Sequence, residues 1–352
     1  MDWFERLTGF RETNYDDTRA KLAVDGSRLR SLINGRSYAI GELELVRLQT
    51  LRERAKSASA LAGRLKVSVV RGDVRKMHRL PENANALFQV ASQFNLLEMT
   101  SYNITPEHGV TRYQHDPTQG PACAIAAGAG TIYRNYFAPV GGGQGQTKDR
   151  QFDGLADLGK ALSDALKQPV NALWKMQNGC ALCTRSGLDA IAEHLSSLDS
   201  QQLESLRGKL CIGIHGDVEV TDAAEKARPL VSQAFCSALP VQYTFVAPSQ
   251  WESFASLVLE ASYEATMWAA VWNAQRGASN VVLLTSLGGG AFGNDKNWIH
   301  AAMRRALKMM SQTDLDVRLV SYGAPSHTLL QMAEELTESH RREPPSTKIS
   351  VC

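Results

Sequence analysis

Short uncharged runs of aliphatic and β-branched residues alternate with segments of helical periodicity along most of this chain. The runs at 86–91 and 280–285 carry no charge, which is typical of strands buried on both faces of a sheet. Further runs that predict strands lie at 65–71, 209–214, 241–246 and 317–321. Apolar residues at helical spacing predict helices at 222–239, 251–275 and 295–310. This alternation predicts an α/β fold with a mainly parallel sheet covered on both faces.

The two ends of the chain have other patterns. Apolar residues at 19–33 and 41–61 recur at helical intervals among Arg, Glu and Lys, so we expect residues 1–62 to form a helical N-terminal extension. The α/β domain is expected at 63–330, with a glycine-rich loop and a mainly helical insertion at about 138–207. Residues 331–352 are expected to form a charged C-terminal tail.

Composition narrows the class of protein. With 352 residues, of which 43% are hydrophobic and 21% charged, the chain is long enough for a full globular core. The net charge of +2, without a basic stripe, does not indicate nucleic-acid binding. We find neither a signal peptide pattern nor a membrane-length apolar run. We therefore expect a cytoplasmic protein, or one delivered into a host cytosol if it is a secreted effector.

Six scattered cysteines are too few for a disulfide framework in a chain of this size and suggest a reducing compartment. Cys180 and Cys183 have the spacing of half a zinc site, but no second pair of ligands completes it. Two small buried residues are the favoured interpretation, and no metal site is expected.

A glycine-rich turn follows the predicted strand at 280–285. It comprises Gly288, Gly289, Gly290, Ala291, Phe292 and Gly293, and Asn294 and Asp295 then begin an amphipathic helix. Such a turn presents backbone N–H groups at the positive end of a helix dipole, which is an anion cradle and most often a diphosphate cradle. A tight turn without a ligand is the alternative. The spacing differs from a dinucleotide fingerprint, and no acidic residue follows about twenty positions later.

Polar residues also follow the predicted strand at 86–91, where Ser92, Gln93, Phe94 and Asn95 form a loop. Ligands of α/β sheets bind at the carboxyl ends of the strands. Pro121 then opens a helix of small residues at 121–130, which would allow a backbone or a ligand to approach closely. Close packing of this helix on the sheet explains the pattern equally well.

The order of these elements resembles that of the macrodomain superfamily, which binds ADP-ribose and hydrolyses ADP-ribosyl bonds. The resemblance covers roughly 65–330 and rests on Gly72-Asp73-Val74, on the loop that ends in Asn95, on the small-residue helix, and on Gly288–Gly293. It implies a three-layer α/β/α fold with a mixed sheet. By the same resemblance, Asp73 would contact adenine, Asn95 the distal ribose, and the glycine turn the diphosphate, with Gln93, Phe94 and Asn294 beside them.

The chain departs from the usual macrodomain pattern in two ways. About twenty-four residues separate Asn95 from Gly120, where the family has a run of glycines soon after the asparagine, and the chain is nearly twice a minimal macrodomain. It most resembles the large, divergent macrodomains that remove ADP-ribose from ADP-ribosylated ubiquitin. This implies an ADP-ribosylated protein, with ubiquitin as a candidate, as partner, and ADP-ribose as ligand or product without a required cofactor.

Hydrolysis of a ribosyl bond passes through an oxocarbenium-like state, which needs carboxylate or carbonyl groups near the ribose C1″ atom and a positioned water. Asp295 and Glu98 are the acidic candidates, and Asn95 is the third predicted catalytic residue. A helix N-cap is the alternative role of Asp295, and a solvated loop acid that of Glu98. Phe94 and Phe292 would form walls of the ribose site or belong to the core.

Other candidate groups are weaker. His215 and Asp217 end a predicted strand, and Glu260 and Glu264 lie four residues apart on one predicted helix, where a solvated face is more common than a metal site. No GxSxG element supports a serine hydrolase. A reader module that binds ADP-ribose without catalysis is the first alternative function, and an NAD-dependent oxidoreductase is the second.

Overall fold

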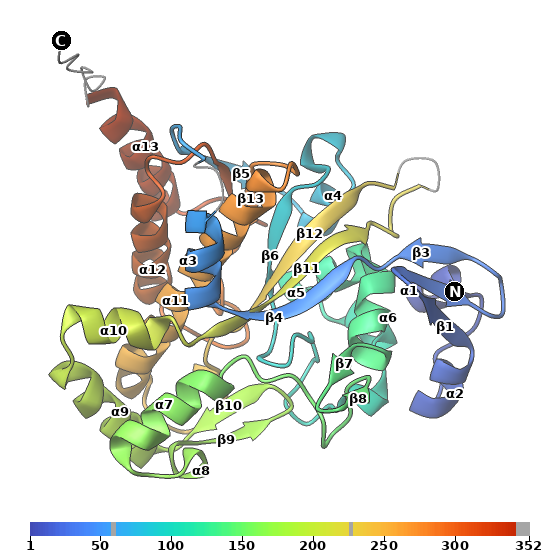
Figure 1. The fold of residues 1–352 in the computed structure, drawn as a ribbon, viewed down its shortest axis with the longest axis horizontal. Helices are drawn as coiled ribbons and strands as arrows, with labels where there is room; N and C mark the ends of the chain where they lie inside the picture. Colours follow the sequence, from blue (N-terminus) through green and yellow to red (C-terminus); the bar gives the residue numbers. More distant parts are fainter. Residues whose placement is uncertain (58–60, 225–227, 343–352) are drawn as a thin grey trace.

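A seven-stranded sheet forms the centre of the computed structural model, which describes residues 1–57, 61–224 and 228–342. The strand order is β4(Glu42–Arg47), β11(Cys211–Glu219), β12(Leu230–Cys236), β6(Leu87–Ala91), β13(Val281–Leu284), β14(Asp316–Ser321) and β5(Lys66–Arg71) (Figure 1). The five strands from β12 to β5 are parallel, whereas β11 runs antiparallel to both of its neighbours. The predicted α/β fold with a mixed, mainly parallel sheet is confirmed.

Alternate side chains of each strand enter separate cores on the two faces of the sheet. On β13, Val282 and Leu284 belong to one core, and Val281 and Leu283 to the other. The first core contains the helices α3(Leu48–Ser57), α9(Arg185–Ser197), α11(Pro248–Gln275), α12(Lys296–Met309) and α13(His327–Arg342). The second core contains α4(Val74–Met77) and α5(Gln119–Ala126). All four residues of β13 are therefore buried, as their uncharged pattern predicts.

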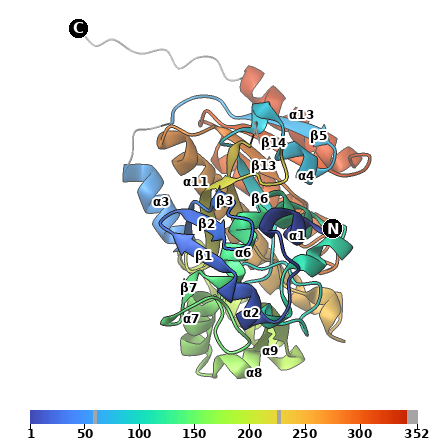
Figure 2. The ribbon, with the colours of Figure 1, turned by 90° about the vertical axis from the view of Figure 1, so that its right-hand side faces the viewer.

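The predicted helical extension at 1–62 is wrong over much of its length. Short helices α1(Trp3–Thr8) and α2(Tyr15–Ala20) are followed by a small antiparallel sheet of β1(Leu22–Asp25), β2(Arg28–Ser31) and β3(Ser37–Ala39). The sequence then enters the central sheet as β4, whose Glu42-Leu43-Glu44-Leu45 repeat has the period of a strand. The N-terminal elements pack beside α6(Gly128–Tyr136), as Figure 2 shows.

Two elements in the middle of the chain were also misassigned from the sequence. The structure has the strand β12 and the short 3-10 helix η5(Val241–Tyr243), where a helix at 222–239 and a strand at 241–246 were predicted; residues 225–227 of that helix lie outside the described residues. A central strand covered on both faces needs no polar alternation, so β12 carries no period-two signal. β11 begins close to the predicted start and extends to Glu219.

The segment at 138–207 is mixed rather than mainly helical. It contains a short hairpin of β7(Pro139–Val140) and β8(Gly143–Gln144), then α7(Ala156–Leu166) and α8(Val170–Leu173). A second hairpin, β9(Trp174–Gln177) and β10(Cys180–Cys183), precedes α9 and α10(Ser200–Arg207). Of the predicted tail, residues up to 342 belong to α13, and those from 343 lie outside the described residues. None of the described helices combines the length and apolar character needed to span a membrane.

The sheet brings two predicted binding loops together. β13 pairs in parallel with β6, with Val282 opposite Leu87, so the glycine turn after β13 and the loop after β6 leave the same edge as neighbours. The first turn of α5 lies against the end of β6, because a Cβ atom on Gly120 would come within 2.0 Å of the Ala91 carbonyl oxygen. The glycine turn, the loop after β6 and the first turn of α5 therefore meet at the carboxyl edge of the sheet.

Candidate functional site

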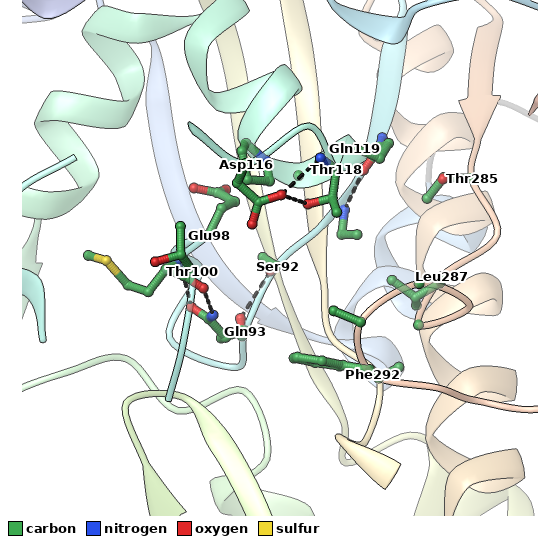
Figure 3. Close-up of a pocket in the computed structure, with 18 of the residues that line it drawn as sticks. Ser92, Gln93, Glu98, Thr100, Asp116, Thr118, Gln119, Thr285, Leu287 and Phe292 are labelled. Atoms are coloured by element: carbon green, nitrogen blue, oxygen red, sulfur yellow. Dashed lines mark hydrogen bonds between the residues drawn. The ribbon is translucent and has the colours of Figure 1, made fainter. Parts of the chain in front are cut away.

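A cleft opens at the carboxyl ends of β6 and β13 (Figure 3). It encloses roughly 740 Å³ of empty space, counting the part open to solvent. The lining comes from residues 91–93, 98–100, 118–121, 285–288 and 290–292, together with Asp116, Ala238 and Tyr243. None of these lining residues is Lys, Arg or His.

The glycine turn has a conformation that side chains would disturb. Gly288 and Gly293 have positive φ angles of 74° and 68°, and a Cβ atom on either would come within 2.4 Å of a neighbouring side-chain atom. Gly290 differs, because a Cβ atom there would meet nothing within 4 Å. Gly290 lines the cleft, so a side chain can be added at the rim of the cleft without a clash in the fold.

Two groups of backbone donors border the cleft. The N–H groups of Gly290, Ala291 and Phe292 donate to no other described residue, and neither do those of Gln119 and Gly120 in the first turn of α5. Unpaired N–H groups in a glycine turn and at a helix N-terminus together favour an anion. This arrangement supports the predicted anion cradle and adds to it a second side formed by α5.

The side chain of Gln119 fixes α5 to the sheet. Its Oε1 atom accepts from the backbone N–H of Ala91 at 2.9 Å, and its Nε2 atom donates to the carbonyl of Gln89 at 2.8 Å. The side-chain amide of Gln119 thus makes the backbone hydrogen bonds that a neighbouring strand would make with the end of β6. Because both ends of its amide are used, Gln119 shapes the cleft, and its backbone N–H is the group available to a ligand.

The loop after β6 is closed upon itself. Gln93 accepts from the N–H of Met99 at 3.0 Å and donates to its carbonyl at 2.6 Å, while the N–H of Gln93 donates to Leu97. Between them Leu96 has a positive φ of 64°, an uncommon conformation for a leucine. These bonds place Glu98 in the wall of the cleft.

Glu98 forms a completely buried ion pair with Arg134 of α6. Nη2 of Arg134 lies 3.1 Å and 3.2 Å from the two carboxylate oxygens, and both side chains are 0% exposed. Burial raises the pKa of the Glu98 carboxyl to about 7, although the neighbouring guanidinium acts in the opposite direction. Glu98 therefore changes its charge near neutral pH.

Asp116 lies at the same end of the cleft as Glu98 (Figure 3). Its Oδ1 atom accepts from the backbone N–H and the hydroxyl of Thr118, at 2.9 Å and 2.6 Å. Its Oδ2 atom has no hydrogen-bond partner among the described residues, and the residue is partly exposed. Asp116 is thus an oriented carboxylate with one oxygen available to a ligand or a water.

Aromatic rings form another wall of the cleft. Phe292 of the glycine turn contacts Tyr243 edge to face, with ring centroids 5.3 Å apart, and Tyr243 contacts Tyr102 at 5.4 Å. The backbone N–H of Gln242 donates to the carbonyl of Phe292, which ties η5 to the turn. Such a wall suits the apolar faces of a sugar or another ring.

The structure brings only part of the predicted site together. Gln93, Glu98, Gly288, Gly290, Ala291 and Phe292 line the cleft. Gly289, Gly293 and Asn294 belong to the turn but do not line the cleft, and Asn294 donates to the carbonyl of Leu239.

The remaining predicted residues lie elsewhere. Asn95 is fully buried and turned away, because its amide accepts from Leu97 and donates to Gln151. Phe94 packs in the core. Asp295 is the N-cap of α12, and Asp73 is the N-cap of α4 after the edge strand β5. Both acids lie outside the cleft lining, so their predicted roles receive no support from this geometry.

The lining residues that the sequence pattern does not indicate include Asp116, Thr118, Gln119 and Tyr243. The first three lie in a polar segment before Pro121 that has the composition of an ordinary loop. The one feature that could indicate a binding role is that this segment directly precedes a helix of small residues. Tyr243 lies in a segment whose sequence pattern predicts a strand, whereas the structure has the 3-10 helix η5 there. Tyr243 reaches the cleft because the preceding segment forms β12 and then η5.

The weaker candidates have structural roles. His215 is buried within β11, which runs antiparallel and so does not end at the binding edge, and its ring bonds to the carbonyl of Ile40. Glu264 pairs with Arg52 and Arg305 at 2.6 and 2.7 Å, and Glu260 pairs with Arg207. Cys180 and Cys183 are buried, and burial raises the pKa of both thiols. Within the described ranges, no three His, Cys, Asp or Glu residues gather as a metal site would require.

No family model matches this chain, and no curated protein matches it. Among solved structures, the chain is similar to poly(ADP-ribose) glycohydrolase from Deinococcus radiodurans in complex with ADP-ribose, at 13% identity and a TM-score of 0.44 over 85% of this chain and 94% of that one. It is also similar to poly(ADP-ribose) glycohydrolase from Thermomonospora curvata, at 12% identity and a TM-score of 0.41 over 90% of this chain and 94% of that one. At these values, the interpretation of the cleft rests on its own geometry.

Proposed function

We propose that this protein binds ADP-ribose in the cleft and hydrolyses the bond between the distal ribose and a modified protein. The observation that carries the proposal is the meeting of two sets of unpaired backbone N–H groups with two acidic side chains in one cleft. A diphosphate between the glycine turn and α5 would lie next to Asp116 and Glu98, where the attached ribose is then expected.

The cleft suits a diphosphate that is held by backbone donors. Its lining contains no cationic side chain, so an anion there would be held by the N–H groups of Gly290, Ala291 and Phe292, by those of α5, and by hydroxyl groups of the lining. Backbone donors allow close approach without a flexible cation, and the absence of a Cβ atom at Gly290 adds to the space around the turn.

The acidic end of the cleft supports hydrolysis rather than binding alone. Asp116 has a free oxygen that can accept a proton from a water attacking the C1″ atom, while Thr118 holds its other oxygen. Glu98 lies buried in the wall of the cleft, and its negative charge would stabilise the positive charge that develops on the ribose. A reader module would require neither carboxylate, and we therefore favour the hydrolase over that alternative.

The first test is calorimetric titration with ADP-ribose of the wild type, of Gly290→Glu, and of Ala301→Glu. The Gly290 variant places a carboxylate in the cradle without a clash, whereas exposed Ala301 lies on α12 and receives the same charge as a control. We expect binding by the wild type and the control only. Equal binding by all three proteins, or none by the wild type at millimolar ligand, would contradict the proposed site.

The second test measures release of ADP-ribose from modified proteins. ADP-ribosylated ubiquitin is the first substrate to try, because of the resemblance to the divergent macrodomains, and proteins modified on other side chains follow. Turnover that Asp116→Asn removes would support the hydrolase. Saturable binding without turnover on any linkage would instead support the reader, and a fluorescence change with NADH would support the oxidoreductase.

A further inference from the structure

We propose that Arg134, which lies on α6 outside the cleft lining, is the positioning residue for its acidic end: it holds the loop after β6 in shape and favours the charged form of Glu98. This inference rests on the proposed function and extends it to the control of the site by pH. Arg134 matches no sequence motif, and its role follows only from the contacts in the fold.

Arg134 holds the most unusual backbone in the loop. Its Nε atom donates to the carbonyl of Leu96 at 3.1 Å, and Leu96 is the residue with the positive φ. Leu96 is buried against Gly213 of β11, where a Cβ atom would lie only 2.7 Å from the leucine side chain. A strained residue persists only where its surroundings determine it, and the guanidinium is one of the groups that does so here.

The same guanidinium holds Glu98, two residues further along. Nη2 donates to both carboxylate oxygens and also lies 3.2 Å from the hydroxyl of Thr131. The plane of the guanidinium covers Phe235, with its central carbon 3.9 Å from the ring centroid. Arg134 therefore joins the loop, α6 and β12, and a lysine lacks the planar fork whose Nε and Nη2 atoms bond Leu96 and Glu98 separately.

Arg134 is also the cation that acts on Glu98. Three titratable groups near this pair are Tyr113, which precedes α5, Cys123 of α5 and His215 of β11, and Asp116 lines the same cleft as Glu98. Burial raises the pKa of Tyr113 and of Cys123 well above their ordinary values, so both are neutral. Burial and the nearby guanidinium lower the pKa of His215 to about 3, so it is neutral as well.

Two opposing effects thus set the charge of Glu98. Burial favours the neutral acid, and Arg134 favours the carboxylate. The ionised form is the one that stabilises positive charge on the ribose, so activity is expected to fall on the acid side of about pH 7. Without the guanidinium, Glu98 would remain protonated at neutral pH.

The test compares pH profiles of kcat and of ADP-ribose affinity for wild type, Arg134→Gln, Arg134→Lys and Glu98→Gln. For Arg134→Gln we expect the acid limb of kcat to move upward by at least about one pH unit, since a close opposite charge shifts a carboxyl pKa by about 1–3 units. For Arg134→Lys the limb should stay near that of the wild type, with a lower plateau of kcat. Glu98→Gln should remove the limb altogether.

Arg52→Lys is the matched control, because Arg52 also pairs with a buried glutamate, Glu264, but lies away from the cleft. It should leave the limb unchanged. A carbon NMR titration of the Glu98 carboxyl gives a readout that is independent of activity, and Arg134→Gln should raise the midpoint. An unchanged midpoint and limb in folded Arg134→Gln would overturn the inference while leaving the proposed function intact. Failure of the wild type to bind ADP-ribose would instead contradict the proposed function.

Discussion

Gly120 of α5 and Ala91 of β6 lie so close together that a Cβ atom on Gly120 would be 2.0 Å from the Ala91 carbonyl oxygen. This approach positions the first turn of α5 over the end of the strand and brings its N–H groups to the cleft. This close contact explains why Gly120, directly before the small-residue helix predicted at 121–130, carries no side chain. The backbone of β6 leaves no space there for a side chain.

We expect Gly120→Ala to weaken ADP-ribose binding by tenfold or more and to lower the free energy of unfolding by about 1–3 kcal/mol, because overpacking displaces α5 from the sheet. Calorimetry and urea denaturation measure the two effects. Gly323→Ala is the stability control, since a Cβ atom there meets nothing within 4 Å. Unchanged affinity in Gly120→Ala would show that the first turn of α5 is not part of the site.

Asp116→Asn should reduce kcat on an ADP-ribosylated protein by roughly 10²–10⁴-fold, the usual contribution of a general base. The amide retains an oxygen for Thr118 but cannot take a proton from water. The dissociation constant for ADP-ribose should change by less than about threefold, because the diphosphate is held elsewhere. Single-turnover assays and titration of the same preparation separate the two quantities, and loss of binding with no separate loss of kcat would assign Asp116 to binding instead.

The stability of the protein should depend on the charge of Glu98. Its pKa in the folded state, about 7, is higher than the ordinary value of 4.5, so the folded state binds the extra proton between these values. The contribution of protonated Glu98 to stability is therefore fully present below about pH 4.5 and is lost as pH rises through about 7. Denaturant titrations should show the wild type losing stability relative to Glu98→Gln over this window, and parallel curves would contradict the shifted pKa.

Tyr243→Ala should weaken ADP-ribose binding, by about tenfold, because it removes the middle ring of the aromatic wall. Phe245→Ala is a control two residues away, since Phe245 is fully exposed and does not line the cleft. Isothermal titration of both variants gives the comparison. A larger effect at Phe245 than at Tyr243 would move the ligand out of the cleft described here.

The amino-acid sequence correctly predicts those strands, turns and helices whose pattern lies in consecutive residues. The uncharged run at 280–285, the glycines after it and the amphipathic helix from Asp295 predicted β13, its turn and α12, because burial and helical period are written in consecutive residues. The parallel pairing of β13 with β14 agrees with the helix predicted between them, whereas the helix and strand predicted at 222–246 were wrong. The pattern of the glycine turn therefore predicts an anion cradle from the sequence alone.

Which other side chains lie beside the glycine cradle depends on the tertiary structure. Asp116, Gln119 and Tyr243 reach the cleft because β6 and β13 are neighbours and because η5 follows β12, and neither relationship has a local signal. The resemblance predicts Asn95 as a ligand residue. In the structure its side chain donates to Gln151 and lies against Gly179, and it does not line the cleft. Hydrogen bonds between distant segments set the direction of a side chain, so the partners that orient Glu98 and Asn95 emerged only when the chain was folded.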